Sequence, residues 1–121
     1  MIPKFRAWLN PDMYEEPVIH DGKFYLDWRD FEDGKTYDLA VLMQSTDLKD
    51  KNGIEIFEDD VVKLKYTITS DLEFFRVTRF RGGSWRIDNR RRGSELWLRN
   101  EDCEVVGNIY QNSELLERLE G

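Results

Sequence analysis

The chain has 121 residues, 40% of them hydrophobic and 36% charged, with a formal net charge of −7. This length predicts a single domain over residues 1–121, and the negative charge argues against non-specific binding of nucleic acid or anionic membranes. The single cysteine excludes an intrachain disulfide and cysteine-based zinc fingers. The sequence has no secretion signal and no apolar run of about 18 residues, so we expect a cytoplasmic protein without membrane contacts.

The first half of the chain predicts short strands joined by turns. Residues 4–9 alternate polar and apolar side chains as a strand does, and a turn signal follows at residues 10–12. Residues 24–28 are a further extended segment, whereas the acidic, aperiodic segment 29–38 predicts a loop. The apolar run at residues 40–46 has the length of a strand.

The second half carries stronger strand patterns. Asn52-Gly53 is the clearest hairpin-turn signal, because both central residues of such a turn need positive φ. Residues 61–68 alternate apolar side chains with lysines, and further strands are predicted at residues 72–80 and 104–110. Short strands joined by turns favour a mainly β fold (β-rich α+β), built as a small curved antiparallel sheet or an SH3-like barrel.

A short C-terminal helix is predicted after the last strand. Asn112 or Ser113 could cap this helix, and Leu115, Leu116 and Leu119 give it an apolar stripe. A helix this short is marginal in water by itself, so we expect the stripe to pack against the domain. If Leu116 belongs to the core, its replacement by alanine should cost roughly 2–5 kcal/mol.

Three stretches of the chain carry a family resemblance. They are KFRAW at residues 4–8, the segment 43–63, and VVGNIYQNSELL at residues 105–116. Together they resemble the YopX family, which is encoded mainly by phages and prophages of Gram-positive bacteria and has no assigned biochemical activity. The chain departs from the family pattern at Asp47 and Asp59, where glycine is usual. Aspartate takes positive φ less readily than glycine, so these departures concern the local backbone.

The sequence predicts no catalytic, cofactor or metal site. His20 lies in a turn signal and is expected to be exposed, while the acidic neighbours of Cys103 would raise its thiol pKa. A calcium-loop pattern that would start at Asp50 fails, because Glu55 stands where that loop needs glycine. We expect the acidic run at residues 58–60 to be a solvated turn, and we expect no enzyme activity.

An arginine-rich hairpin at residues 76–99 is the main candidate for a binding surface. Residues 71–100 contain eight arginines against four acidic residues, a net charge of +4, so the rest of the chain carries −11. Arginine makes bidentate contacts with phosphate or carboxylate, and two tryptophans flank a run of three arginines as in single-strand binders. The candidate contact residues are Trp85, Arg86, Arg90, Arg91, Arg92 and Trp97.

These arginines have three possible uses. They can pair with acidic residues of the same chain or of a second copy, bind an acidic protein partner, or bind nucleic-acid phosphates. At least two of the three consecutive arginines must meet solvent, acidic protein or phosphate, because unpaired buried charge is too costly. The favoured hypothesis is a non-enzymatic phage or prophage accessory protein acting through protein–protein contacts, by self-association or with a host factor. The alternative is a nucleic-acid-binding module.

Overall fold

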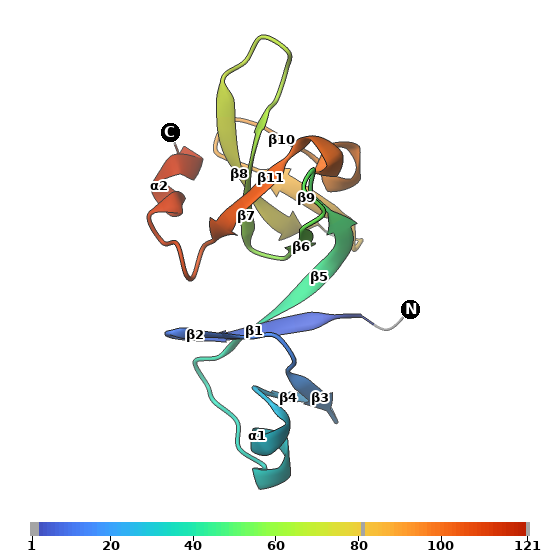
Figure 1. The fold of residues 1–121 in the computed structure, drawn as a ribbon, viewed down its shortest axis with the longest axis vertical. Helices are drawn as coiled ribbons and strands as arrows, with labels where there is room; N and C mark the ends of the chain where they lie inside the picture. Colours follow the sequence, from blue (N-terminus) through green and yellow to red (C-terminus); the bar gives the residue numbers. More distant parts are fainter. Residues whose placement is uncertain (1–2, 81, 121) are drawn as a thin grey trace. The chain divides into compact units, whose positions relative to one another are not determined.

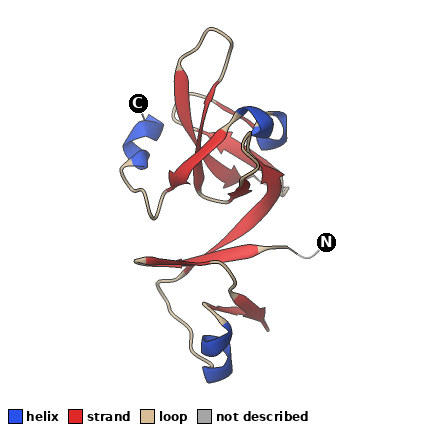
Figure 2. Cartoon of the chain, viewed as in Figure 1, coloured by secondary structure: helices blue, strands red, loops and turns tan. Residues whose placement is uncertain are grey.

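The computed structural model describes residues 3–80 and 82–120. The chain forms two compact units, residues 1–45 and 46–121, and the strand β5 (Val41–Lys49) runs from the first into the second. The prediction of a mainly β fold with curved antiparallel sheets and a short C-terminal helix is confirmed (Figures 1 and 2).

The first unit consists of short strands and one short helix. Its elements, before the chain reaches β5, are β1 (Phe5–Leu9), β2 (Asp12–Tyr14), β3 (Val18–His20), β4 (Lys23–Tyr25) and α1 (Trp28–Asp33). The central strand β1 pairs antiparallel with both β2 and β5. The turn signal at residues 10–12 is confirmed, because Leu9 is paired with Asp12 across the β1–β2 hairpin. A second hairpin, β3–β4, forms its own two-stranded sheet.

The loop predicted at residues 29–38 is wrong, because α1 occupies its first half. The carboxylate of Asp27 accepts a hydrogen bond from the Asp30 backbone N–H at 2.9 Å, and Gly34 ends the helix with φ of 66°. Phe31 packs its ring against Tyr25, with a centroid distance of 5.3 Å. A cap at each end and one packed aromatic residue stabilise a helix too short to show a periodic pattern.

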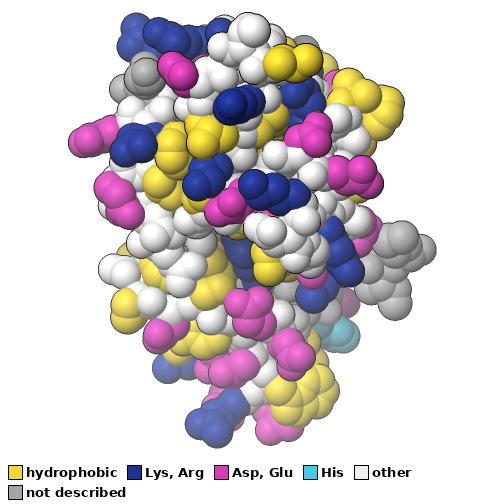
Figure 3. All heavy atoms as spheres, turned by 45° about the horizontal axis from the view of Figure 1, so that its top comes forward, with side chains coloured by type: hydrophobic (Ala, Val, Ile, Leu, Met, Phe, Trp, Pro, Cys, Tyr) yellow, Lys and Arg dark blue, Asp and Glu magenta, His cyan; other side chains and the backbone are white. Residues whose placement is uncertain are grey.

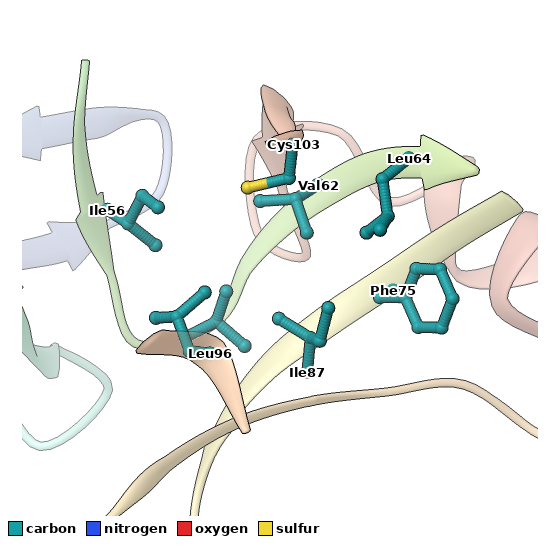
Figure 4. Packing of buried hydrophobic residues seen from close by; sticks show 8 residues of the cluster. Ile56, Val62, Leu64, Phe75, Ile87, Leu96 and Cys103 are labelled. Carbon is teal, nitrogen blue, oxygen red and sulfur yellow. The ribbon is translucent and has the colours of Figure 1, made fainter. Parts of the chain in front are cut away.

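The second unit is built on an antiparallel sheet with short elements around it. Its elements are β6 (Glu55–Phe57), β7 (Asp60–Lys65), β8 (Leu72–Arg79), β9 (Trp85–Asp88), β10 (Gly93–Glu95), η1 (Leu96–Leu98), η2 (Asn100–Asp102), β11 (Glu104–Asn108) and α2 (Leu115–Glu120). The sheet has five strands in the order β10-β9-β8-β7-β11. Alternate residues of β7 and β8 point into one apolar core, which includes Val62, Leu64, Phe75 and Val77 (Figure 4).

The tight turn at Asn52-Gly53 is confirmed, and it joins β5 to its neighbour β6. The Gly53 backbone N–H donates to the Asp50 carbonyl at 3.0 Å, and Gly53 has φ of 80°. The positive φ expected at Asn52 is wrong, since only Gly53 takes the left-handed conformation within this turn. The carboxylate of Asp50 stabilises the turn in place of a second left-handed residue, because it accepts hydrogen bonds from the Asn52 and Ile54 backbone N–H groups.

Two sequence predictions placed exposed apolar residues in the core. The strand predicted at residues 61–68 ends at Lys65, and Ile68 is 96% exposed instead of lying on the core face. In α2, Leu115 and Leu119 are half-buried but Leu116 is 42% exposed. Alternation cannot show where a strand leaves its sheet, since that depends on where the pairing strand begins.

We therefore expect Leu116→Ala to lower the free energy of unfolding by less than about 1 kcal/mol, because an exposed side chain leaves no cavity. Leu115→Ala is the matched comparison on the half-buried face, and it should cost more than Leu116→Ala. Urea unfolding followed by circular dichroism measures both. A loss of about 2 kcal/mol or more for Leu116→Ala would place this residue in the core.

Candidate functional site

The loop that carries the three consecutive arginines is organised by Asn89. Its side-chain oxygen accepts hydrogen bonds from the backbone N–H groups of Arg91 and Arg92, at 2.8 and 2.9 Å. Its side-chain nitrogen donates to the Phe74 carbonyl at 3.0 Å, which ties the loop to β8. Asparagine suits this position because its amide replaces backbone partners in tight turns. The β9–β10 hairpin therefore presents its arginines from an ordered loop.

Several of the candidate arginines are used within the chain. Arg86 lies between two carboxylates, with nitrogen–oxygen distances of 3.3 Å to Asp88 and 3.5 Å to Glu95. The hydrogen bond to Asp88, followed by the charges of Asp88 and Glu95, raises the pKa of Arg86. Arg92 pairs with Glu73 at 3.5 Å and lies over the Tyr66 ring at 4.8 Å. Figure 3 shows basic and acidic side chains interspersed over the face that it draws.

Arg90 and Arg91 differ from these residues. Both are exposed, and their side chains have no ionic partner among residues 3–80 and 82–119. The Arg90 backbone N–H donates to the Leu119 carbonyl at 3.1 Å, so the loop is attached to the end of α2. Arg91 lines a hollow of about 380 Å³ between β8 and α2, and Arg90 lines one of about 460 Å³ that shares Asn89 and Leu119 with it.

The two tryptophans do not join this loop. In the β9–β10 register Gly93 pairs with Asp88 and Glu95 with Arg86, so Trp85 lies at the far end of the hairpin from Arg90 and Arg91. Trp85 is half-buried, with the Arg79 guanidinium 5.3 Å from its ring. Trp97 follows β10 in η1 and is 64% exposed. The two tryptophans flank the arginine run in the sequence, but they do not form one binding surface with Arg90 and Arg91.

A second polar cluster, centred on Asp59, was missed from the sequence. Asp59 Oδ1 accepts from Arg76 Nη2 at 2.8 Å and from Nε at 3.0 Å, while Oδ2 accepts from the Tyr110 hydroxyl at 3.1 Å. Burial, with the charge and hydrogen bond of Asp59, raises the pKa of Tyr110. Asp59 has φ of 68°, so the departure from glycine at this position was the one sequence signal of a special role.

The expectation that residues 58–60 form a solvated turn is wrong for Asp60. This residue is 1% exposed, and its carboxylate accepts the Phe57 backbone N–H at 2.8 Å. The acidic run therefore includes a buried residue that stabilises the turn between β6 and β7. Buried carboxylates are tolerated where backbone donors satisfy them.

The remaining candidates for chemistry are His20 in the first unit and Cys103 in the second. His20 is exposed at the end of β3, just before the β3–β4 turn, with Nε2 3.3 Å from the Asp21 carboxylate. Burial raises the pKa of the Cys103 thiol to about 12, so almost no thiolate exists at neutral pH. Within the described residues, no three His, Cys, Asp or Glu side chains are placed to hold a metal, and no helix is long and apolar enough to cross a membrane.

Comparisons with known proteins identify the family. The model of the YopX protein family matches residues 4–117. Protein EF1440 from Enterococcus faecalis has a similar solved structure, with a TM-score of 0.63 and 28% identity, over 96% of this chain and 99% of that one. Protein yopX from Bacillus subtilis has the same fold, with a TM-score of 0.60 and 19% identity, over 93% and 96% of the two chains. No curated protein matches the sequence significantly. The chain therefore belongs to the YopX family.

Proposed function

We propose that this YopX-family protein is a non-enzymatic accessory protein of a phage or prophage that acts through protein–protein contacts. The observation that carries the proposal is the state of Arg90 and Arg91. An ordered loop presents both guanidinium groups without an ionic partner among the described residues, whereas Arg86 and Arg92 are paired within the chain. Two exposed charges on an ordered loop, which the fold does not pair, are suited to a carboxylate-bearing protein surface.

The pairing of the neighbouring arginines favours a protein partner over nucleic acid. A single-strand binder combines a continuous basic groove with aromatic platforms for the bases. Here acidic residues neutralise Arg86 and Arg92, and the tryptophans lie away from the loop. The chain as a whole carries −7, which repels a polyanion except at this loop. Cytoplasmic location and the absence of enzyme activity are parts of the same proposal.

A nucleic-acid-binding module remains the alternative use of the same loop. It is favoured by one observation, the exposure of two adjacent arginines, since arginine also makes bidentate contacts with phosphate. In this case each arginine would contribute about one unit to the dependence of affinity on salt.

The test is the double variant Arg90→Ser/Arg91→Ser. Arg92 is left in place because it pairs with Glu73 and stacks on Tyr66, so its loss would disturb the fold. The tagged protein is used to capture host proteins from nuclease-treated lysate, and its self-association is measured by sedimentation velocity. We expect a specific protein complex or oligomer for the native chain that the double variant loses.

The control Lys23→Ser/Arg29→Ser removes the same charge from exposed positions in the first unit and should retain the complex. Fluorescence anisotropy with single-stranded DNA at physiological salt tests the alternative. Sub-micromolar binding that the double variant abolishes, with a salt slope lower by ~2 units, would contradict the proposal and establish nucleic-acid binding.

A further inference from the structure

A second basic feature of the 46–121 unit lies outside the arginine loop. It is a groove of about 590 Å³ along β7 and the turn after it. β11 begins at Glu104, opposite Lys63, so β7 beyond this point lacks its β11 neighbour and the groove opens there. The basic lining residues are Lys51, Lys63, Lys65 and Arg99, and the acidic ones are Asp102 and Glu104. We call this feature the β7 groove.

The charge balance of the β7 groove is opposite to that of the chain. Four basic and two acidic residues give it a net charge of +2, whereas the whole chain carries −7. Glu104 is shared between Lys51 and Lys63, with nitrogen–oxygen distances of 3.5 and 3.8 Å. Lys65 is exposed, and no carboxylate in the described part of the chain pairs with it or with Arg99. The groove therefore retains positive charge that the fold does not neutralise.

Arg99 is held in a fixed orientation within the β7 groove. Its Nη2 donates to the Tyr66 carbonyl at 2.5 Å, and its guanidinium lies over the Tyr66 ring at 4.7 Å. Tyr66 is fixed in turn, since its hydroxyl donates to the Gly93 carbonyl at 2.9 Å and Arg92 also lies over its ring. Because this guanidinium is already ordered, it loses little conformational entropy when it binds an anion. It therefore binds an anion more favourably than a mobile arginine would.

The β7 groove also offers apolar contacts beside its charges. Ile68 is 96% exposed and Leu72 is 54% exposed, and both line the groove. Exposed apolar side chains next to unneutralised cations suit a ligand that carries carboxylates on either side of an apolar residue. A single phosphate would use the charges but leave Ile68 and Leu72 uncovered.

We propose that the β7 groove binds an acidic segment of a partner protein in which carboxylate side chains flank an apolar one. This inference rests on the proposed function, because it names the chemistry of one partner contact. Arg99 and Lys65 contact the carboxylates, and Ile68 and Leu72 cover the apolar side chain. Asp102 and Glu104 disfavour a nucleic-acid backbone, which would bring uniform negative charge along the groove.

The test uses a fluorescein-labelled peptide, Gly-Glu-Glu-Leu-Glu-Glu-Gly, titrated with the full chain and followed by fluorescence anisotropy. We expect saturable binding that weakens about tenfold in Arg99→Gln, as for a lost hydrogen bond to a charged group. Lys65→Gln, at an exposed position that the fold does not need, should weaken binding about threefold. Lys23→Gln removes an exposed lysine in the first unit and should leave binding unchanged.

Peptides with glutamine for glutamate, or serine for leucine, should bind more weakly than the probe. The inference is overturned if the native chain does not bind the probe at about 1 mM, or if the glutamine peptide binds equally well. It is also overturned if oligothymidylate binds more tightly than the probe and is lost in Arg99→Gln, or if Lys65→Gln instead dissociates a homodimer. Arg90→Ser/Arg91→Ser should retain probe binding, so a failure here is distinct from a failure of the proposed function.

Discussion

Replacing Phe75 with alanine is expected to destabilise the second unit by about 3–5 kcal/mol. Phe75 is fully buried in β8, it is the largest of the fully buried side chains, and its ring lies 6.1 Å from that of Tyr66. Its removal would leave a cavity that the strands of one sheet cannot close. The free energy of unfolding of a domain is typically about 5–15 kcal/mol, so this substitution would remove much of the stability.

Urea unfolding followed by tryptophan fluorescence and circular dichroism measures this loss. Phe80→Ala is the matched control, because it removes the same side chain from a position just after β8 that is 57% exposed. We expect the control to change stability by less than about 1 kcal/mol. Equal losses for the two variants would show that the apolar core does not lie where β7 and β8 place it.

A second large effect is expected for Asp50→Ala, a loss of roughly 3 kcal/mol or more. The carboxylate of Asp50 is 5% exposed and accepts three backbone N–H groups. Two of them, from Asn52 and Ile54, belong to the β5–β6 turn at 2.8 and 2.9 Å, and the third, from Val105 at 2.8 Å, belongs to β11. Hydrogen bonds to charged groups contribute about 1.5–3 kcal/mol each, and alanine leaves all three donors unsatisfied.

Asp50→Asn separates the two halves of this role. Its amide oxygen can still accept the two turn N–H groups, but its amide nitrogen is a donor and cannot accept from Val105. We expect the stability of Asp50→Asn to lie between those of the native chain and Asp50→Ala. Hydrogen exchange should become faster at the Val105 amide and change little at the Ile54 amide. A stable Asp50→Ala variant with unchanged exchange at both amides would contradict this account.

The parts of the fold that the sequence predicted are those that depend on neighbouring residues. The alternation in residues 61–65 gave the face of β7 that holds Val62 and Leu64, and Gly53 marked the β5–β6 turn. The C-terminal helix was predicted from its leucines and its capping residues, although it begins at Leu115. In each case the side chains within a few residues determine the local backbone.

The predictions that were wrong concern features that depend on contacts between residues distant in the sequence. The helix α1 is packed through Phe31 against Tyr25, and β7 ends at Lys65, where its pairing with Leu72 at the start of β8 ends. The burial of Asp60 requires the N–H of Phe57 to turn toward it, which no periodic pattern encodes. Acidic residues were interpreted as solvated because that is their usual position.

The candidate site was predicted in composition but not in arrangement. Counting charges identified the arginine-rich segment, yet it did not show that Glu73 and Glu95 neutralise Arg92 and Arg86. Glu95 and Arg86 lie on neighbouring strands, and Glu73 on β8 pairs with Arg92 in the β9–β10 loop, so the arrangement of the sheet decides which arginines remain unpaired. The β7 groove was missed for the same reason, since its lysines and Arg99 are brought together from β7 and the segments around it.

The cluster of Asp59 with Arg76 and Tyr110 has a consequence for how related chains diverge. Glycine at position 59 adopts the left-handed turn with less strain, but it cannot bind the Arg76 guanidinium or the Tyr110 hydroxyl. Single substitutions at any one of these positions therefore leave a polar partner unsatisfied. The family pattern retains the segment that contains Tyr110, so in family members with glycine at position 59 the hydroxyl at position 110 must meet water or a different acceptor.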